Sequence, residues 1–128
     1  EGACYGQYFL EMADYYTREN MEARGMLLLV YQSLRALLKP QIPNKLIQRV
    51  FELKAMVFHG EYTEKPPICV SDSANYTWEY VLKSPIEKLY TFVVTEEVFE
   101  EFRKCVDINK SRYIDREFHS LDILQMLR

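Results

Sequence analysis

The sequence predicts an all-α fold: a single compact domain of about six to seven helices over residues 1–128. Apolar residues recur at three- and four-residue spacing through most of the chain, and turn-forming residues gather in only one long segment. Only residues 92–94 resemble a strand, which is too little for a sheet. With 128 residues, 48% of them hydrophobic, the chain is long enough to bury one core and short for two.

The first two helices are predicted by one-sided apolar patterns. The first spans about residues 3–18, with its apolar face formed by Tyr5, Tyr8, Phe9, Met12 and Tyr16. The second must end before Pro40, because a residue that precedes proline is pushed away from helical angles. Its core stripe is expected to contain Leu27, Val30, Tyr31, Leu34 and Leu38.

A third helix is predicted after Pro43, which suits the first turn. We expect it to be buried on more than half of its circumference, because a wide stripe contains Leu46, Ile47, Val50, Phe51, Leu53, Val57 and Phe58. Gly60 is expected to end this helix in the left-handed conformation.

The second half of the chain begins with an irregular segment, residues 60–75. A short helix follows over residues 76–83; it is anchored by Trp78 and is expected to start as early as about Ser73. The capping box of Ser84, Pro85 and Glu87 predicts another helix that starts at Ser84. Thr95 is expected to cap a helix that continues through Tyr113. A last short helix is predicted from Ser120, with Leu121, Leu124 and Leu127 on one stripe.

Composition excludes several classes of function. Sixteen basic and 19 acidic residues give a net charge of -3, which argues against a surface that grips nucleic acid throughout. No apolar run approaches the roughly 20 residues that a membrane span needs. The three cysteines, Cys4, Cys69 and Cys105, are too far apart for a disulfide framework, so we expect a cytoplasmic protein. The chain starts at Glu1 and reads as a fragment of a longer protein.

Catalytic and metal motifs are absent from the sequence. His59 and His119 have no second ligand at metal spacing, and there is no glycine-rich phosphate loop or Cys-x-x-Cys pair. A Cys-dependent hydrolase or transferase would need Cys69 or Cys105 as a reactive thiolate beside a histidine. A structural role for each cysteine is the expected one, and we predict that the domain is not an enzyme and uses no cofactor.

Four segments in order resemble a known family. They are YFLEMADYY (8–16), RVFELKAMVFHGEY (49–62), SPIEKLYTF (84–92) and YIDREFHSLDIL (113–124). Together they are similar to the C-terminal helical domain of the bacterial recombination mediator RecO, most of all in Clostridium-like Gram-positive bacteria. The resemblance covers nearly the whole chain.

The resemblance implies a function in DNA repair and recombination, in the nucleoid. In that family an N-terminal OB-fold, absent from this chain, precedes the helical domain. RecO proteins work with RecR, bind single-stranded DNA and the acidic tail of single-strand binding protein, anneal strands and help to load RecA. The resemblance thus implies a partner-binding domain, with DNA bound mainly by the absent barrel. The alternative is a structural domain that supports the barrel and exposes an apolar patch where the barrel docks.

The partner site is expected to be an apolar socket flanked by basic residues, which would take the carboxylates of the tail. The candidates are Lys45 and Arg49 on the third helix, or Arg112 and Arg116 near the C-terminus. Many relatives hold zinc with two Cys-x-x-Cys pairs after the Gly-Glu-Tyr turn. Here Cys69 occupies roughly the first ligand position without partners, so we predict that the zinc knuckle is lost and that no metal is bound.

Overall fold

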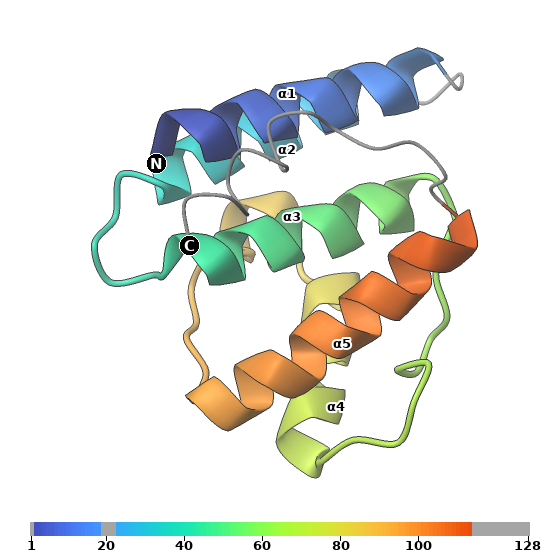
Figure 1. Ribbon diagram of the computed structural model, residues 1–128. Coiled ribbons are helices and arrows are strands. Elements are labelled where there is room, and N and C mark those ends of the chain that lie inside the picture. The colour runs from blue at the N-terminus through green and yellow to red at the C-terminus, as the bar shows by residue number, and fades with distance from the viewer. Residues whose placement is uncertain (1, 19–22, 114–128) are drawn as a thin grey trace.

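A computed structural model describes residues 2–18 and 23–113. These residues form five α-helices and one short 3-10 helix, without strands, so the predicted all-α class is confirmed (Figure 1). The elements are α1 (Gly2–Arg18), α2 (Ala23–Ala36), α3 (Asn44–Phe58), α4 (Asp72–Lys83), η1 (Ile86–Lys88) and α5 (Glu96–Tyr113). None of these helices has the length and apolar character needed to cross a bilayer.

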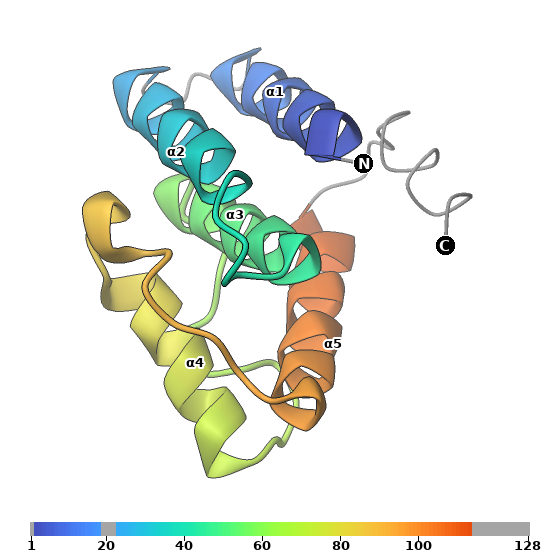
Figure 2. The same ribbon diagram turned by 90° about the vertical axis from the view of Figure 1, so that its left-hand side faces the viewer.

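The central element is α3. Helices α1 and α2 lie side by side over one flank of it, and α4 and α5 lie on the other (Figure 2). Every residue of α3 from Leu46 to Met56 is buried except Arg49, which confirms most of the wide stripe that the sequence predicted. Its last two members differ, since Val57 is half-buried and Phe58 is 37% exposed. Gly60 ends the helical run with φ of 76°, a left-handed conformation that glycine adopts without a Cβ clash.

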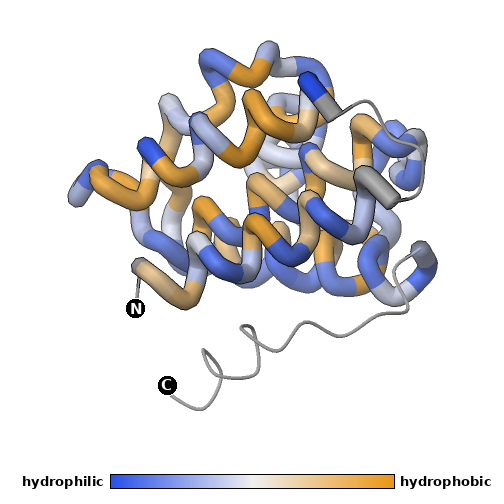
Figure 3. The backbone as a smooth tube through the Cα atoms, turned by 90° about the horizontal axis from the view of Figure 1, so that it is seen from above, coloured by the Kyte–Doolittle hydropathy of each residue, from blue (hydrophilic) through white to orange (hydrophobic). Residues whose placement is uncertain are grey.

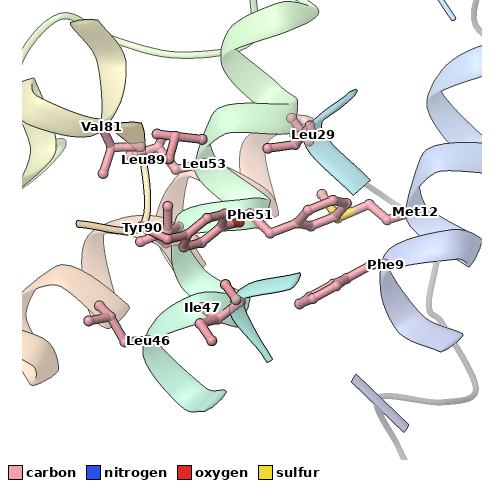
Figure 4. Packing of buried hydrophobic residues seen from close by; sticks show 14 of the residues in the cluster. Phe9, Met12, Leu29, Leu46, Ile47, Phe51, Leu53, Val81, Leu89 and Tyr90 are labelled. Carbon is pink, nitrogen blue, oxygen red and sulfur yellow. The ribbon is translucent and has the colours of Figure 1, made fainter. Parts of the chain in front are cut away.

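The core joins the two flanks through aromatic side chains of α3 and its neighbours. The ring of Phe51 stacks on Phe9 of α1, with centroids 4.4 Å apart (Figure 4). On the other flank, Trp78 of α4 packs edge-on against Phe102 of α5 and donates its indole N–H to the carbonyl of Thr63 at 2.9 Å. Trp78 therefore fixes the irregular segment after α3 as well as the α4–α5 pair.

The C-terminal end of α4 is held by a buried lysine of α3. The Lys54 ammonium donates to the carbonyls of Val81, Leu82 and Ser84 at 3.0, 3.1 and 2.7 Å. A cation at this position satisfies carbonyl groups that have no partner inside the helix and also favours the negative end of the helix dipole. Burial lowers the pKa of Lys54.

Several predicted boundaries are confirmed. Helix α1 matches the predicted span, and Thr95 caps α5 by accepting from the N–H of Val98 at 3.3 Å. Helix α5 continues through Tyr113, the last described residue, as expected. The predicted final helix from Ser120 lies outside the described residues.

Of two boundary predictions in the second half, one is confirmed and one is wrong. Helix α4 begins at Asp72, next to the start expected near Ser73, because the Ser71 hydroxyl accepts from the N–H of Ala74 and caps the helix there rather than at Tyr76. The helix predicted to start at Ser84 is only the three-residue η1, without a side-chain cap. Ser84 instead ends α4, since its N–H bonds to the carbonyl of Tyr80. The described chain accordingly has fewer α-helices than the six to seven expected.

We expect Phe51→Ala to lower the free energy of unfolding by about 3–5 kcal/mol, because it leaves a cavity between α1 and α3. Urea denaturation of the 128-residue chain measures this loss. The control is Leu38→Ala, whose side chain is 84% exposed and should change stability by less than about 0.5 kcal/mol. Equal losses in the two variants would contradict this description of the core.

Candidate partner-binding surface

Helix α2 presents an apolar face to solvent. The predicted core stripe is wrong here: of its five members only Val30 is buried, while Leu27, Tyr31 and Leu38 are 65, 55 and 84% exposed. Leu28 and Leu34 are exposed as well, and Figure 3 shows apolar positions along this part of the chain. Contiguous exposed apolar side chains of this kind mark interaction surfaces in soluble proteins.

The orientation of α2 is set by its opposite face. Met26, Leu29 and Ala36 are buried there beside Ser33, whose hydroxyl bonds to the carbonyl of Leu29 at 2.7 Å and to the buried Tyr90 hydroxyl. A buried hydroxyl needs such partners, so the Ser33 side of the helix faces inward. On α1, a Cβ added to Gly6 would lie 3.2 Å from Leu34, so the glycine allows the two helices to approach closely.

Basic residues accompany the exposed apolar side chains. Arg24 and Arg35 fall on the same side of α2, and Lys39 follows in the next turn; all three are exposed. The Arg35 guanidinium lies 5.6 Å from the Tyr31 ring centroid. Residues 23–39 contain no Asp or Glu, and no ion pair within the described part of the chain uses these three cations. We call Arg24, Leu27, Leu28, Tyr31, Leu34, Arg35, Leu38 and Lys39 the α2 face.

A hollow adjoins the C-terminal end of the α2 face. Its volume is about 360 Å³, and its lining includes Lys39, Ile42, Tyr90, Phe92 and Val93. The hollow thus combines an apolar wall with an ammonium group that no described carboxylate neutralises. An aromatic side chain next to a carboxylate is the kind of group that fits these features.

The basic residues that the sequence singled out on α3 face carboxylates of α5. Lys45 lies 2.6 Å from Glu96, while Arg49 pairs with Glu52 and Asp107. The Arg49 side chain is only 11% exposed. Arg112 lies exposed in the last turn of α5, and Arg116 is outside the described residues. The structure therefore brings Lys45 and Arg49 onto the α3–α5 contact.

Arg49 belongs to a buried polar cluster that has no local signal in the sequence. The carboxylate of Glu52 is fully buried and accepts from Lys110 at 2.6 Å, from Arg49 at 3.2 Å and from the Tyr8 hydroxyl. Burial alone would raise the pKa of Glu52, but the charges of Lys110 and Arg49 outweigh it and hold the pKa below its ordinary value. Burial and the neighbouring Glu52 charge raise the pKa of Tyr8. This cluster ties α1, α3 and α5 together.

The cysteines are separate from one another. Cys69 is exposed, Cys4 is half-buried and Cys105 is buried. Burial raises the pKa of the Cys105 thiol to about 11, the reverse of what a nucleophilic thiolate needs. Within residues 2–18 and 23–113, no group of three or more His, Cys, Asp or Glu side chains is placed to hold a metal ion.

The Glu52 cluster predicts acid sensitivity. A carboxyl whose pKa is lower in the folded state contributes stability above its ordinary pKa of 4.5, and this contribution is lost as the pH falls through the folded value. We expect Glu52→Gln to cost about 3 kcal/mol near neutral pH, because it leaves Lys110 and Arg49 without their carboxylate, and to flatten the loss of stability in acid.

Denaturant midpoints measured from neutral pH down to about pH 3 test this expectation. The matched control is Glu64→Gln, since Glu64 is exposed and should leave the pH profile unchanged. A Glu52→Gln profile that follows the wild type at every pH would contradict the role of the cluster.

We expect the purified chain to contain no stoichiometric zinc, because one thiolate cannot close a four-coordinate site. Metal analysis checks this directly, and a chelator should leave the melting temperature unchanged. A full complement of zinc that disappears in Cys69→Ser would overturn the prediction.

Comparison with known proteins supplies the family. A family model described as "Recombination protein O C terminal" matches residues 1–64, which hold α1 to α3 and the turn after them. Neither the curated proteins nor the solved structures gave a match. The match does not distinguish lineages, so the Clostridium-like resemblance stays a prediction. With half of the chain matched, this protein belongs to the recombination protein O C-terminal family, whose role is in DNA recombination and repair.

Proposed function

We propose that this domain is a partner-binding module of a recombination mediator, without catalytic activity, and that its partner is the acidic, aromatic-ended tail of single-strand binding protein. Contributions to RecR binding, single-stranded DNA binding, annealing and RecA loading belong to the same proposal, with DNA bound mainly by a preceding barrel.

The observation that carries the proposal is the α2 face. An acidic tail needs apolar surface for its hydrophobic side chains and unneutralised cations for its carboxylates. Leu27, Tyr31 and Leu34 supply the first requirement, and Arg24 and Arg35 supply the second. The lack of acidic residues in 23–39 removes the repulsion that an acidic partner would otherwise meet on this helix.

The hollow beside Lys39 suits the end of such a tail. Ile42 and Phe92 would contact the terminal aromatic ring, while the Lys39 ammonium would pair with the terminal carboxylate. The tail would then run along α2 with its acidic residues beside Arg35 and Arg24. This arrangement uses no cation that is already paired within the described structure.

Titration of a labelled tail peptide against charge-reversed variants tests the proposal. We expect Arg35→Glu and Lys39→Glu each to weaken binding about tenfold, because each replaces an attraction with a repulsion. Raising the salt from about 0.05 to about 0.5 M should weaken wild-type binding and affect the variants less. Both positions are exposed, so circular dichroism should show intact folding.

The same titration tests the four residues proposed from the sequence. The set is Lys45→Glu, Arg49→Glu, Arg112→Glu and Arg116→Glu, and Lys65→Glu, at another exposed position, is the surface control. A loss of affinity confined to these four variants would move the site to α3 and α5. Unchanged affinity in all six variants would overturn tail binding through either surface.

The second candidate function is structural support of a preceding barrel, and the exposed leucines of α2 also favour it, since a docked domain would cover them. Under this alternative the isolated chain does not bind the tail peptide. Fusing an upstream barrel would then bury Leu27 and Leu38, which cysteine labelling at these positions would detect as lost reactivity. Residues 23–39 contain three basic residues and no acidic ones, and this positive charge favours an acidic partner over a neutral domain surface.

A further inference from the structure

A second concave site adjoins the hollow beside Lys39, with which it shares Thr91, Phe92 and Val93. It is a groove of about 770 Å³ between α4, the extended residues 92–94 and the first turns of α5. Figure 2 shows the extended connection passing over α4 before it enters α5. The volume is in the range of sites that bind small ligands or peptide side chains.

The walls of the groove are aromatic and fixed in place. Tyr76 and Tyr80 of α4 lie with ring centroids 6.1 Å apart, and Phe92 packs edge-on against Tyr80 at 5.2 Å. The Tyr80 hydroxyl shares a hydrogen bond with that of Thr91 at 2.7 Å, which holds the extended segment against α4. Tyr76 itself is 68% exposed, so its ring is open to a ligand.

The extended segment forms the facing wall. Five consecutive residues from Thr91 to Thr95 line the groove. In the described part of the chain, the N–H and C=O groups of Phe92, Val93 and Val94 have no hydrogen-bond partner. The nearest backbone–backbone hydrogen bonds along the chain are donated by Leu89 before the segment and by Phe99 after it. Unpaired extended backbone is the element to which another extended chain adds by strand pairing.

Charge selects among possible occupants. Asp72 is the one charged residue in the groove lining, and the remainder consists of hydroxyl-bearing, aliphatic and aromatic side chains. A phosphate backbone or an acidic tail would meet a carboxylate without a compensating cation in that lining, whereas a lysine or arginine would be attracted. In a peptide strand, successive side chains point to opposite faces, so a peptide in which every second residue is apolar would place its apolar side chains against the aromatic wall.

We propose that the groove between α4 and residues 92–94 binds an extended peptide strand, which pairs with the backbone of Phe92–Val94, inserts apolar side chains beside Tyr76 and Tyr80, and places a basic residue at Asp72. The ligand differs in charge from the acidic tail proposed for the α2 face, although the groove and the hollow beside Lys39 share Thr91, Phe92 and Val93 in their linings.

Selection from a displayed random heptapeptide library on the 128-residue chain tests the proposal. We expect the selected peptides to have an aromatic or β-branched residue at every second position and to contain Lys or Arg. A synthetic copy of the best peptide should bind Tyr76→Ser about tenfold more weakly. Asp72→Asn should reduce both the affinity and its salt dependence.

Strand pairing has its own matched pair of variants. Val93→Pro removes one N–H from the extended segment and should weaken binding roughly fivefold, while Val93→Thr keeps the N–H and should bind like wild type. Val93 is 60% exposed, so neither change disturbs the core. Failure to enrich any peptide, enrichment of acidic peptides, displacement by oligothymidylate, or equal binding by the proline and threonine variants would overturn the proposal.

Discussion

The rest of the structure depends on one buried carboxylate, that of Glu52. Helix α3 is covered by four other helices, so a charged side chain in its middle must find its partners inside the protein. Lys110 of α5, Tyr8 of α1 and Arg49 of α3 supply them. Removing Lys110 or Arg49 leaves buried charge without a partner, and removing Tyr8 takes a hydrogen bond from the carboxylate, so the cluster fixes how α1, α3 and α5 sit together more strictly than apolar contact alone would.

This cluster also decides which cations are left for partners. Arg49 looks from sequence like a surface arginine one turn from Lys45, yet its guanidinium is shared between Glu52 and Asp107. Breaking those pairs to bind a tail would cost stability, which a surface residue such as Arg35 does not risk. The cations of Arg24, Arg35 and Lys39 form no ion pair in the described structure and lie beside exposed leucines. The binding proposal follows from this difference between cations paired inside the protein and cations free at its surface.

Sequence patterns predicted the helices that are apolar on one side only. Helices α1 and α5 follow their stripes because each has a polar face to contrast with the buried one. In α3 the stripe is buried as predicted over Leu46 to Leu53, but the polar Gln48, Glu52 and Lys54 are buried as well. In α2 the apolar run from Met26 to Tyr31 covers too much of the helix for spacing to choose a face, and the choice is made by a buried hydrogen bond between Ser33 and Tyr90, 57 positions away. The Glu52–Lys110 contact spans 58 positions and likewise has no local signature. The unpaired backbone of residues 92–94 agrees with their strand-like sequence, but only the fold places Tyr76 and Tyr80 across from them.

The central claim is that the partner surface of this recombination protein O domain is the α2 face rather than the α3–α5 contact. Hydrogen–deuterium exchange of the chain, with and without saturating tail peptide, tests it most directly, because it reports which backbone amides the peptide protects without altering any charge. The account predicts slowed exchange in residues 24–39 and at the hollow around Ile42, with residues 45–58 unchanged. Protection confined to the exposed turns of α3 and α5 around Lys45 and Arg112, with α2 exchanging as in the free chain, would contradict it.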